Sequence, residues 1–131
     1  MSDAAELTGV VNEQLELLIS FRVFTAKSET VKAEVTAVID TGFSGGLALP
    51  EEICESLGFE VARFVSGELA DGSKTIVPIY FAEVDWCGVE REIEIAGAGR
   101  TPLVGVQLLA NQSLLAEFVP GGQCRIFPIE P

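Results

Sequence analysis

The fold and the candidate chemistry of this chain are decided by residues 35–46, which read Val-Thr-Ala-Val-Ile-Asp-Thr-Gly-Phe-Ser-Gly-Gly. Apolar and polar side chains alternate from Val31 to Ile39, and this period of two predicts a strand with one buried face. The strand leads straight into Asp40-Thr41-Gly42 and a glycine-rich turn. A carboxylate at such a break is aimed out of the sheet, where it can act as a general base toward water.

One carboxylate of this kind is too few for that chemistry, and the sequence contains no second Asp-Thr-Gly and no Asp-Ser-Gly. The second carboxylate must come from another copy of the chain, so a homodimer is the expected assembly if the site works. The competing interpretation is a structural turn, in which Asp40 caps backbone amides and Gly42 takes a positive φ.

Length and charge narrow the classes of function. A chain of 131 residues predicts a single domain, residues 1–131. The net charge is −12, which repels nucleic acid and anionic membranes, so neither is an expected partner. No segment approaches the roughly 18 uninterrupted apolar residues of a spanning helix. The hydrophobic content of 48% is explained equally well by a subunit interface and by a well-filled core.

Histidine is absent, and the three cysteines, Cys54, Cys87 and Cys124, include no C-x-x-C pair. A zinc site and a Ser-His or Cys-His nucleophile are therefore excluded, and we expect no metal and no cofactor. We expect free thiols in a reducing compartment. The first six residues have neither a basic nor an apolar region of a secretory signal, and the cytoplasm is the expected location.

The remaining pattern is dominated by strands. Asp71-Gly72 indicates a tight hairpin turn, and Trp86-Cys87-Gly88 indicates a partly buried one. Strands are expected over residues 9–14, 15–25, 31–39, 59–67, 74–84, 89–96, 113–119 and 123–129, with a loop at 26–30. Pro50 suits the first position of a short helix over residues 50–58, and a second helix is expected over 106–110. The fold class is all-β, a small closed barrel with one or two short helices.

Three elements in order resemble the retropepsin-like aspartic peptidases, in particular cellular or prokaryotic members, and cover roughly residues 9–127. The first is Asp40-Thr41-Gly42 with the turn that follows it. The second is the hairpin around Asp71-Gly72, which falls where the family's flap lies. The third is Leu103-Val104-Gly105, which is similar to the hydrophobic-hydrophobic-Gly motif that crosses behind the catalytic turn and leads into a helix.

The resemblance implies an aspartic endopeptidase acting on a polypeptide substrate. Asp40 of each subunit would activate the water, Thr41 would hydrogen-bond across the dimer axis, and Gly42 would let the substrate backbone approach. The flap would be formed by Ala70, Asp71, Gly72 and Ser73. Structural support of the site would come from Leu103, Val104 and Gly105.

Two positions depart from the viral members of the family. Viral proteases usually carry an acidic residue two positions after the catalytic glycine and a basic residue directly after the downstream glycine. Here these positions hold Ser44 and Val106, so both halves of that ion pair are missing. Two other functions stay open at this point: a catalytically silent module of the same fold that dimerises or binds peptides, and an acidic partner for a basic protein.

Overall fold

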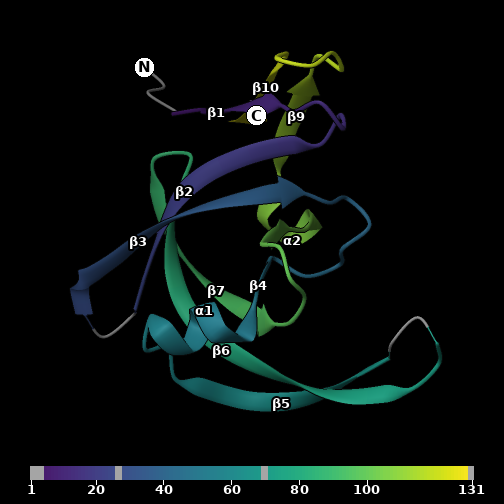
Figure 1. Ribbon diagram of the computed structural model, residues 1–131. Coiled ribbons are helices and arrows are strands. Elements are labelled where there is room, and N and C mark those ends of the chain that lie inside the picture. Colours follow the sequence, from purple (N-terminus) through teal and green to yellow (C-terminus); the bar gives the residue numbers. More distant parts are fainter. Residues whose placement is uncertain (1–4, 26–27, 69–70, 130–131) are drawn as a thin grey trace.

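The computed structural model describes residues 5–25, 28–68 and 71–129, and this part of the chain is built mainly of strands (Figure 1). The strands are β1 (Leu7–Val11), β2 (Leu17–Thr25), β3 (Ser28–Ile39), β4 (Leu47–Leu49), β5 (Val61–Glu68), β6 (Lys74–Trp86), β7 (Val89–Gly97), β8 (Leu103–Val104), β9 (Gln112–Ala116) and β10 (Gln123–Pro128). The helices are α1 (Glu51–Ser56) and α2 (Val106–Leu109). The all-β class predicted from the sequence is confirmed.

Six of these strands form a closed barrel in the order β6, β7, β4, β8, β3 and β2, and pairing of β2 with β6 completes the ring. The β3–β8 and β4–β7 pairs are parallel, whereas the other pairs of the ring are antiparallel. Alternate side chains of β3, namely Val35, Ala37 and Ile39, are buried in the core, as the period of two predicted. The expected closed barrel is confirmed.

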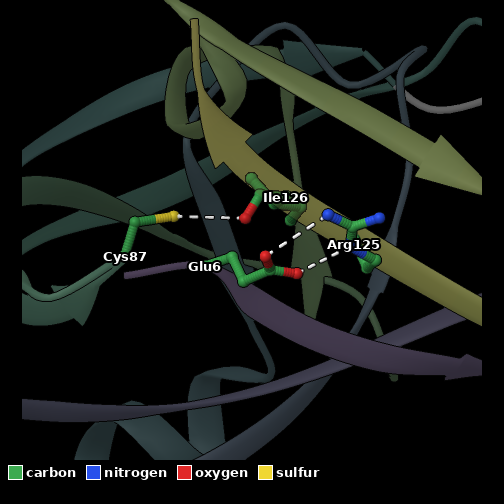
Figure 2. Close-up of polar contacts among 4 residues, drawn as sticks. All are labelled: Glu6, Cys87, Arg125 and Ile126. Atoms are coloured by element: carbon green, nitrogen blue, oxygen red, sulfur yellow. Dashed lines mark hydrogen bonds and ion pairs between the residues drawn. The ribbon is translucent and has the colours of Figure 1, made fainter. Parts of the chain in front are cut away.

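Two extensions leave the ring. Beyond β2 the sheet continues through β1 and β10 to β9, and beyond β6 it continues to β5, whose hairpin with β6 reaches past the barrel (Figure 1). The β1–β10 pairing is tied at its start by Glu6, which accepts hydrogen bonds of 2.6 and 3.3 Å from the Arg125 guanidinium (Figure 2). Beside this ion pair the Cys87 thiol donates to the carbonyl oxygen of Ile126 at 3.8 Å (Figure 2).

Several expected boundaries are wrong. The loop expected at 26–30 is replaced by strand from Ser28, because Thr25 already pairs with Ser28; residues 26 and 27 lie outside the described residues. The strand β4 was not expected because all three of its side chains are buried, which leaves no alternation to recognise. The strand β8 is only two residues long and is defined by its neighbours β3 and β4.

The helix prediction needs a smaller correction. Pro50 lies at the N-cap with an extended ψ of 140°, so α1 begins at Glu51 instead of at the proline. Trp86 and Cys87 are buried and Gly88 is exposed, so the turn is partly buried, as expected. The indole Nε1 of Trp86 donates a 2.7 Å hydrogen bond to Gln112, which ties the β6–β7 turn to β9. No helix within the described ranges has the length and apolar character needed to cross a bilayer.

Candidate active site

Asp40 follows β3 directly and is held at the end of the barrel by three hydrogen bonds. Its backbone N–H donates to the carbonyl oxygen of Val104 at 2.8 Å, and its own carbonyl accepts from the N–H of Phe43 at 3.0 Å. Its carboxylate Oδ1 accepts from the N–H of Gly42 at 2.9 Å. The side chain is half-buried, and Oδ2 has no hydrogen-bond partner among the described residues. One carboxylate oxygen is thus fixed while the other remains available.

The turn after Asp40 is fastened to the segment that begins at β8. The N–H of Gly105 donates to the carbonyl of Gly46 at 2.8 Å, and the N–H of Val106 donates to the carbonyl of Phe43 at 3.0 Å. A third bond of 3.1 Å runs from the N–H of Gln107 to Gly45. Because β8 also lies between β3 and β4, the segment Leu103-Val104-Gly105 passes directly behind the Asp40 turn.

The backbone conformation at position 105 does not demand glycine, because a φ of −103° is accessible to any residue. Gly105 is required because there is no room for a side chain. A Cβ at this position would lie 2.2 Å from the carbonyl oxygen of Gly45 and 2.6 Å from both the ring and the carbonyl oxygen of Phe43. Two of these contacts are with backbone atoms, which cannot rotate away. The close crossing of the two segments therefore depends on glycine.

Asp40 and Thr41 open on a hollow of about 480 Å³. Its remaining walls are mostly apolar and come from the β1–β2 turn, β2, β3, β8, β9 and the segment after β9: Leu15, Glu16, Leu17, Val38, Ile39, Leu103, Leu114 and Phe118. Phe118 is 61% exposed, so the rim of the hollow presents apolar surface to solvent. A separate hollow of about 420 Å³ near Phe59 and Phe81 shares no residue with this one.

The hairpin expected as a flap is formed by β5 and β6, and Ala70 lies outside the described residues. Asp71 Oδ1 accepts from the N–H and the hydroxyl of Ser73 at 2.9 and 2.6 Å, and these bonds lower the pKa of Asp71. Gly72 has a φ of +85°, as a tight turn requires. None of Asp71, Gly72 and Ser73 lines the Asp40 hollow, so the structure does not bring the described flap residues to Asp40.

The inner side of this hairpin carries exposed apolar side chains. Phe64 is 65% exposed and Ile76 is 70% exposed. Ile76 lies on the same face of β6 as Tyr80, whose side chain enters the barrel core, and Phe64 shares that face because it pairs with Pro78. The face that is buried inside the barrel thus continues as an open apolar surface along the hairpin.

The walls of the hollow were not identified from the sequence. Leu15 lies in a turn with a φ of +63°, where an apolar residue has no periodic signal. Leu114 and Phe118 belong to the segment that precedes Pro120, and two apolar pairs, 114–115 and 118–119, were the available signal. In the described ranges no group of three or more His, Cys, Asp or Glu side chains is arranged to hold a metal ion.

No protein-family model and no curated protein sequence matches this chain. Among solved structures, the chain is similar to a retropepsin-like aspartic protease from Rickettsia conorii. The TM-score is 0.57 at 18% sequence identity, and the match covers 95% of this chain and 94% of that one. The barrel has the retropepsin-like fold. At this identity the likeness concerns the path of the backbone, and it assigns no role to individual side chains.

Proposed function

We propose that this protein is an aspartic endopeptidase whose site is completed by two copies of Asp40 in a homodimer. The observation that carries the proposal is the placement of Asp40. Its carboxylate stands at the end of a barrel strand, one oxygen is held by the N–H of Gly42, and the group opens on a hollow with apolar walls. The fold shared with a retropepsin-like aspartic protease supports the same assignment.

The chemistry follows from two carboxylates held close together. Like charges about 3 Å apart cannot both ionise cheaply, so the pair shares one proton and titrates as a unit. The ionised Asp40 takes a proton from a bound water as the water attacks the peptide carbonyl, and the neutral Asp40 donates a hydrogen bond to the developing oxyanion. Thr41 holds the two turns together through its hydroxyl.

The other proposed residues position the substrate. A Cβ on Gly42 would lie 3.2 Å from Asp40 Oδ1, so glycine keeps the approach to the carboxylate open. The hairpin tip at Ala70, Asp71, Gly72 and Ser73 closes over the peptide and limits water. The apolar inner side of the hairpin, with Phe64 and Ile76, supplies the surface that covers the bound chain. Leu103, Val104 and Gly105 support the turn from behind.

The test compares wild type with Asp40→Asn on a mixed peptide library between about pH 3 and 7. Cleavage is expected to disappear in Asp40→Asn, because amide side chains cannot share a proton in this way, while circular dichroism stays unchanged. Asp85→Asn is the matched control. Asp85 forms a solvent-exposed ion pair with Arg22 at 3.7 Å, so this variant should keep most of the activity.

A mixing experiment tests the shared site. Excess Asp40→Asn chains should suppress wild-type cleavage, because each mixed dimer holds one ionisable carboxylate in place of two. Cleavage retained in Asp40→Asn, or lost only in Asp85→Asn, would contradict the proposal. Peptide binding without cleavage in wild type as well as in Asp40→Asn would instead identify a silent peptide-binding module.

A further inference from the structure

The hollow beside Asp40 contains a second charged side chain, Glu16. Of the described residues that line this space of about 480 Å³, Glu16 and Asp40 are the charged ones, and both are acidic. No basic side chain of the described residues lines it. Because Asp40 takes part in the proposed chemistry, Glu16 is the charge that remains to contact a bound chain.

The turn between β1 and β2 holds the Glu16 carboxylate in place. The side-chain amide of Asn12 donates to Glu16 Oε1 at 3.0 Å, and Asn12 Oδ1 accepts from the N–H of Gln14 at 3.0 Å and from that of Glu16 at 2.8 Å. The N–H of Asn12 also donates to the Glu16 carbonyl at 3.0 Å, which closes the turn. Glu16 Oε2 has no hydrogen-bond partner among the described residues. One carboxylate oxygen is therefore positioned, and the other is open to a ligand.

The walls around Glu16 suit the stem of a long side chain. Leu15 is 45% exposed and Phe118 is 61% exposed, whereas Leu17 is buried, so apolar surface runs from the solvent edge into the hollow. Lysine and arginine bury their methylene groups on such a surface and keep the charged head in water. Glu16 is itself exposed and lies at this solvent edge, where a cationic head would meet its open oxygen. An acidic side chain of a substrate would instead be repelled by Glu16.

We propose that Glu16 is a specificity-determining residue, which selects polypeptide substrates that carry a lysine or arginine next to the cleaved bond. The inference rests on the proposed function, and it adds the class of substrate. The net charge of −12 acts in the same direction, because it attracts cationic chains and repels acidic ones. Glu16 supplies the local contact that turns this general attraction into a preference at one position of the substrate.

The test changes the charge of Glu16 and keeps the turn. In Glu16→Gln the side-chain oxygen still accepts the hydrogen bond from Asn12, so the variant should fold as wild type does. Glu13→Gln is the matched control, because Glu13 is an exposed acid of the same turn that does not line the hollow. Glu16→Lys reverses the charge. Circular dichroism checks the fold of each variant.

The substrates are otherwise identical peptides with lysine, norleucine or glutamate next to the cleaved bond. Norleucine has the lysine stem without its charge, so the comparison isolates the ionic contact. At about pH 6, where ordinary carboxylates are ionised, wild type and Glu13→Gln should cleave the lysine peptide about fivefold faster than the norleucine peptide. This ratio should fall to about one in Glu16→Gln, and Glu16→Lys should prefer the glutamate peptide. The wild-type ratio should also shrink between about 0.05 and 0.5 M salt.

Binding of the same peptides gives a measurement that needs no cleavage. Fluorescence anisotropy with Asp40→Asn should give a dissociation constant about fivefold lower for the lysine peptide than for the norleucine peptide. The double variant Asp40→Asn, Glu16→Gln should lose this difference. If Glu16→Lys does not fold, Glu16→Gln and the two binding series decide the matter.

The inference and the proposed function fail in different ways. Cleavage with an unchanged lysine preference in Glu16→Gln would overturn the role of Glu16 and leave the peptidase standing. Lysine-dependent binding that is lost in Glu16→Gln, with no cleavage by wild type, would refute the peptidase and keep Glu16 as the residue that selects basic chains. Loss of the preference in Glu13→Gln as well would overturn the local contact, because net charge alone would then explain the selectivity.

Discussion

Replacing Gly105 by alanine should damage the site more than any other change of one methyl group in the support of the Asp40 turn. The new Cβ would lie 2.2 Å from the carbonyl oxygen of Gly45 and 2.6 Å from the carbonyl oxygen of Phe43. Neither oxygen can swing aside, because each accepts a hydrogen bond from the segment 106–107. The methyl group must therefore push two backbone segments apart.

The size of the effect follows from this geometry. Overpacking that forces backbone shifts costs about 1 to 3 kcal/mol, and contacts with backbone oxygens put Gly105→Ala at the upper end, about 3 kcal/mol. For a domain of this length that corresponds to a fall in Tm of about 10 °C. In Gly105→Ala the new methyl group displaces the hydrogen bonds that hold Phe43 and Gly45. Any peptidase activity should therefore fall together with the stability of the fold.

Gly46→Ala is the matched control. Gly46 accepts the 2.8 Å hydrogen bond from Gly105, yet a Cβ on it would meet its nearest atoms at 3.8 Å, which is ordinary contact. We expect a change in the free energy of unfolding below about 1 kcal/mol. Urea unfolding followed by the fluorescence of the single buried Trp86 measures both variants. Equal stability of the two variants would refute the steric argument.

Three further predictions concern titration. Hydrogen bonds from Arg125 lower the pKa of Glu6, so this pair stabilises the fold above the ordinary glutamate pKa of about 4.3, and the stabilisation is lost as the pH falls through the lowered pKa. The difference in Tm between wild type and Glu6→Gln should therefore disappear in acid. A difference in Tm that grows as the pH falls would contradict this prediction. Burial raises the pKa of Cys54 to about 11, so at pH 8 about one thiol in a thousand is ionised, and a disulfide reagent should label Cys54 only on unfolding. Peptide cleavage should be fastest in acid, because the proposed mechanism needs one proton shared between two carboxylates, and such a pair loses that proton as the pH rises. A rate that climbs to pH 9 would point to another mechanism.

The sequence was most informative where side chains alternate between core and solvent. The run that ends at Ile39 predicted β3 and the position of Asp40, because one face of β3 is buried and the other is exposed. Asp71-Gly72 predicted its hairpin because the turn needs a positive φ that glycine supplies. Both signals are local, and both depend on a few neighbouring residues.

Features made by contacts between distant segments were not predictable in this way. The strand β4 is buried on both sides, and β8 exists only because β3 and β4 flank it. The hollow gathers residues from both ends of the chain, including Leu15 and Phe118, and neither residue has a periodic pattern around it.

The contacts behind the Asp40 turn differ from those expected of viral members of the family at the two positions noted in the sequence. With Ser44 and Val106 in place of an acid and a base, the turn is held instead by neutral backbone hydrogen bonds and by the space left at Gly105. A cation still lies nearby, since Arg91 of β7 donates to the last carbonyls of α2 at 3.2 and 3.4 Å. Neutral bonds do not titrate, whereas an ion pair weakens when its carboxylate is protonated. The support of Asp40 should therefore persist at the acidic pH at which the proposed peptidase would act.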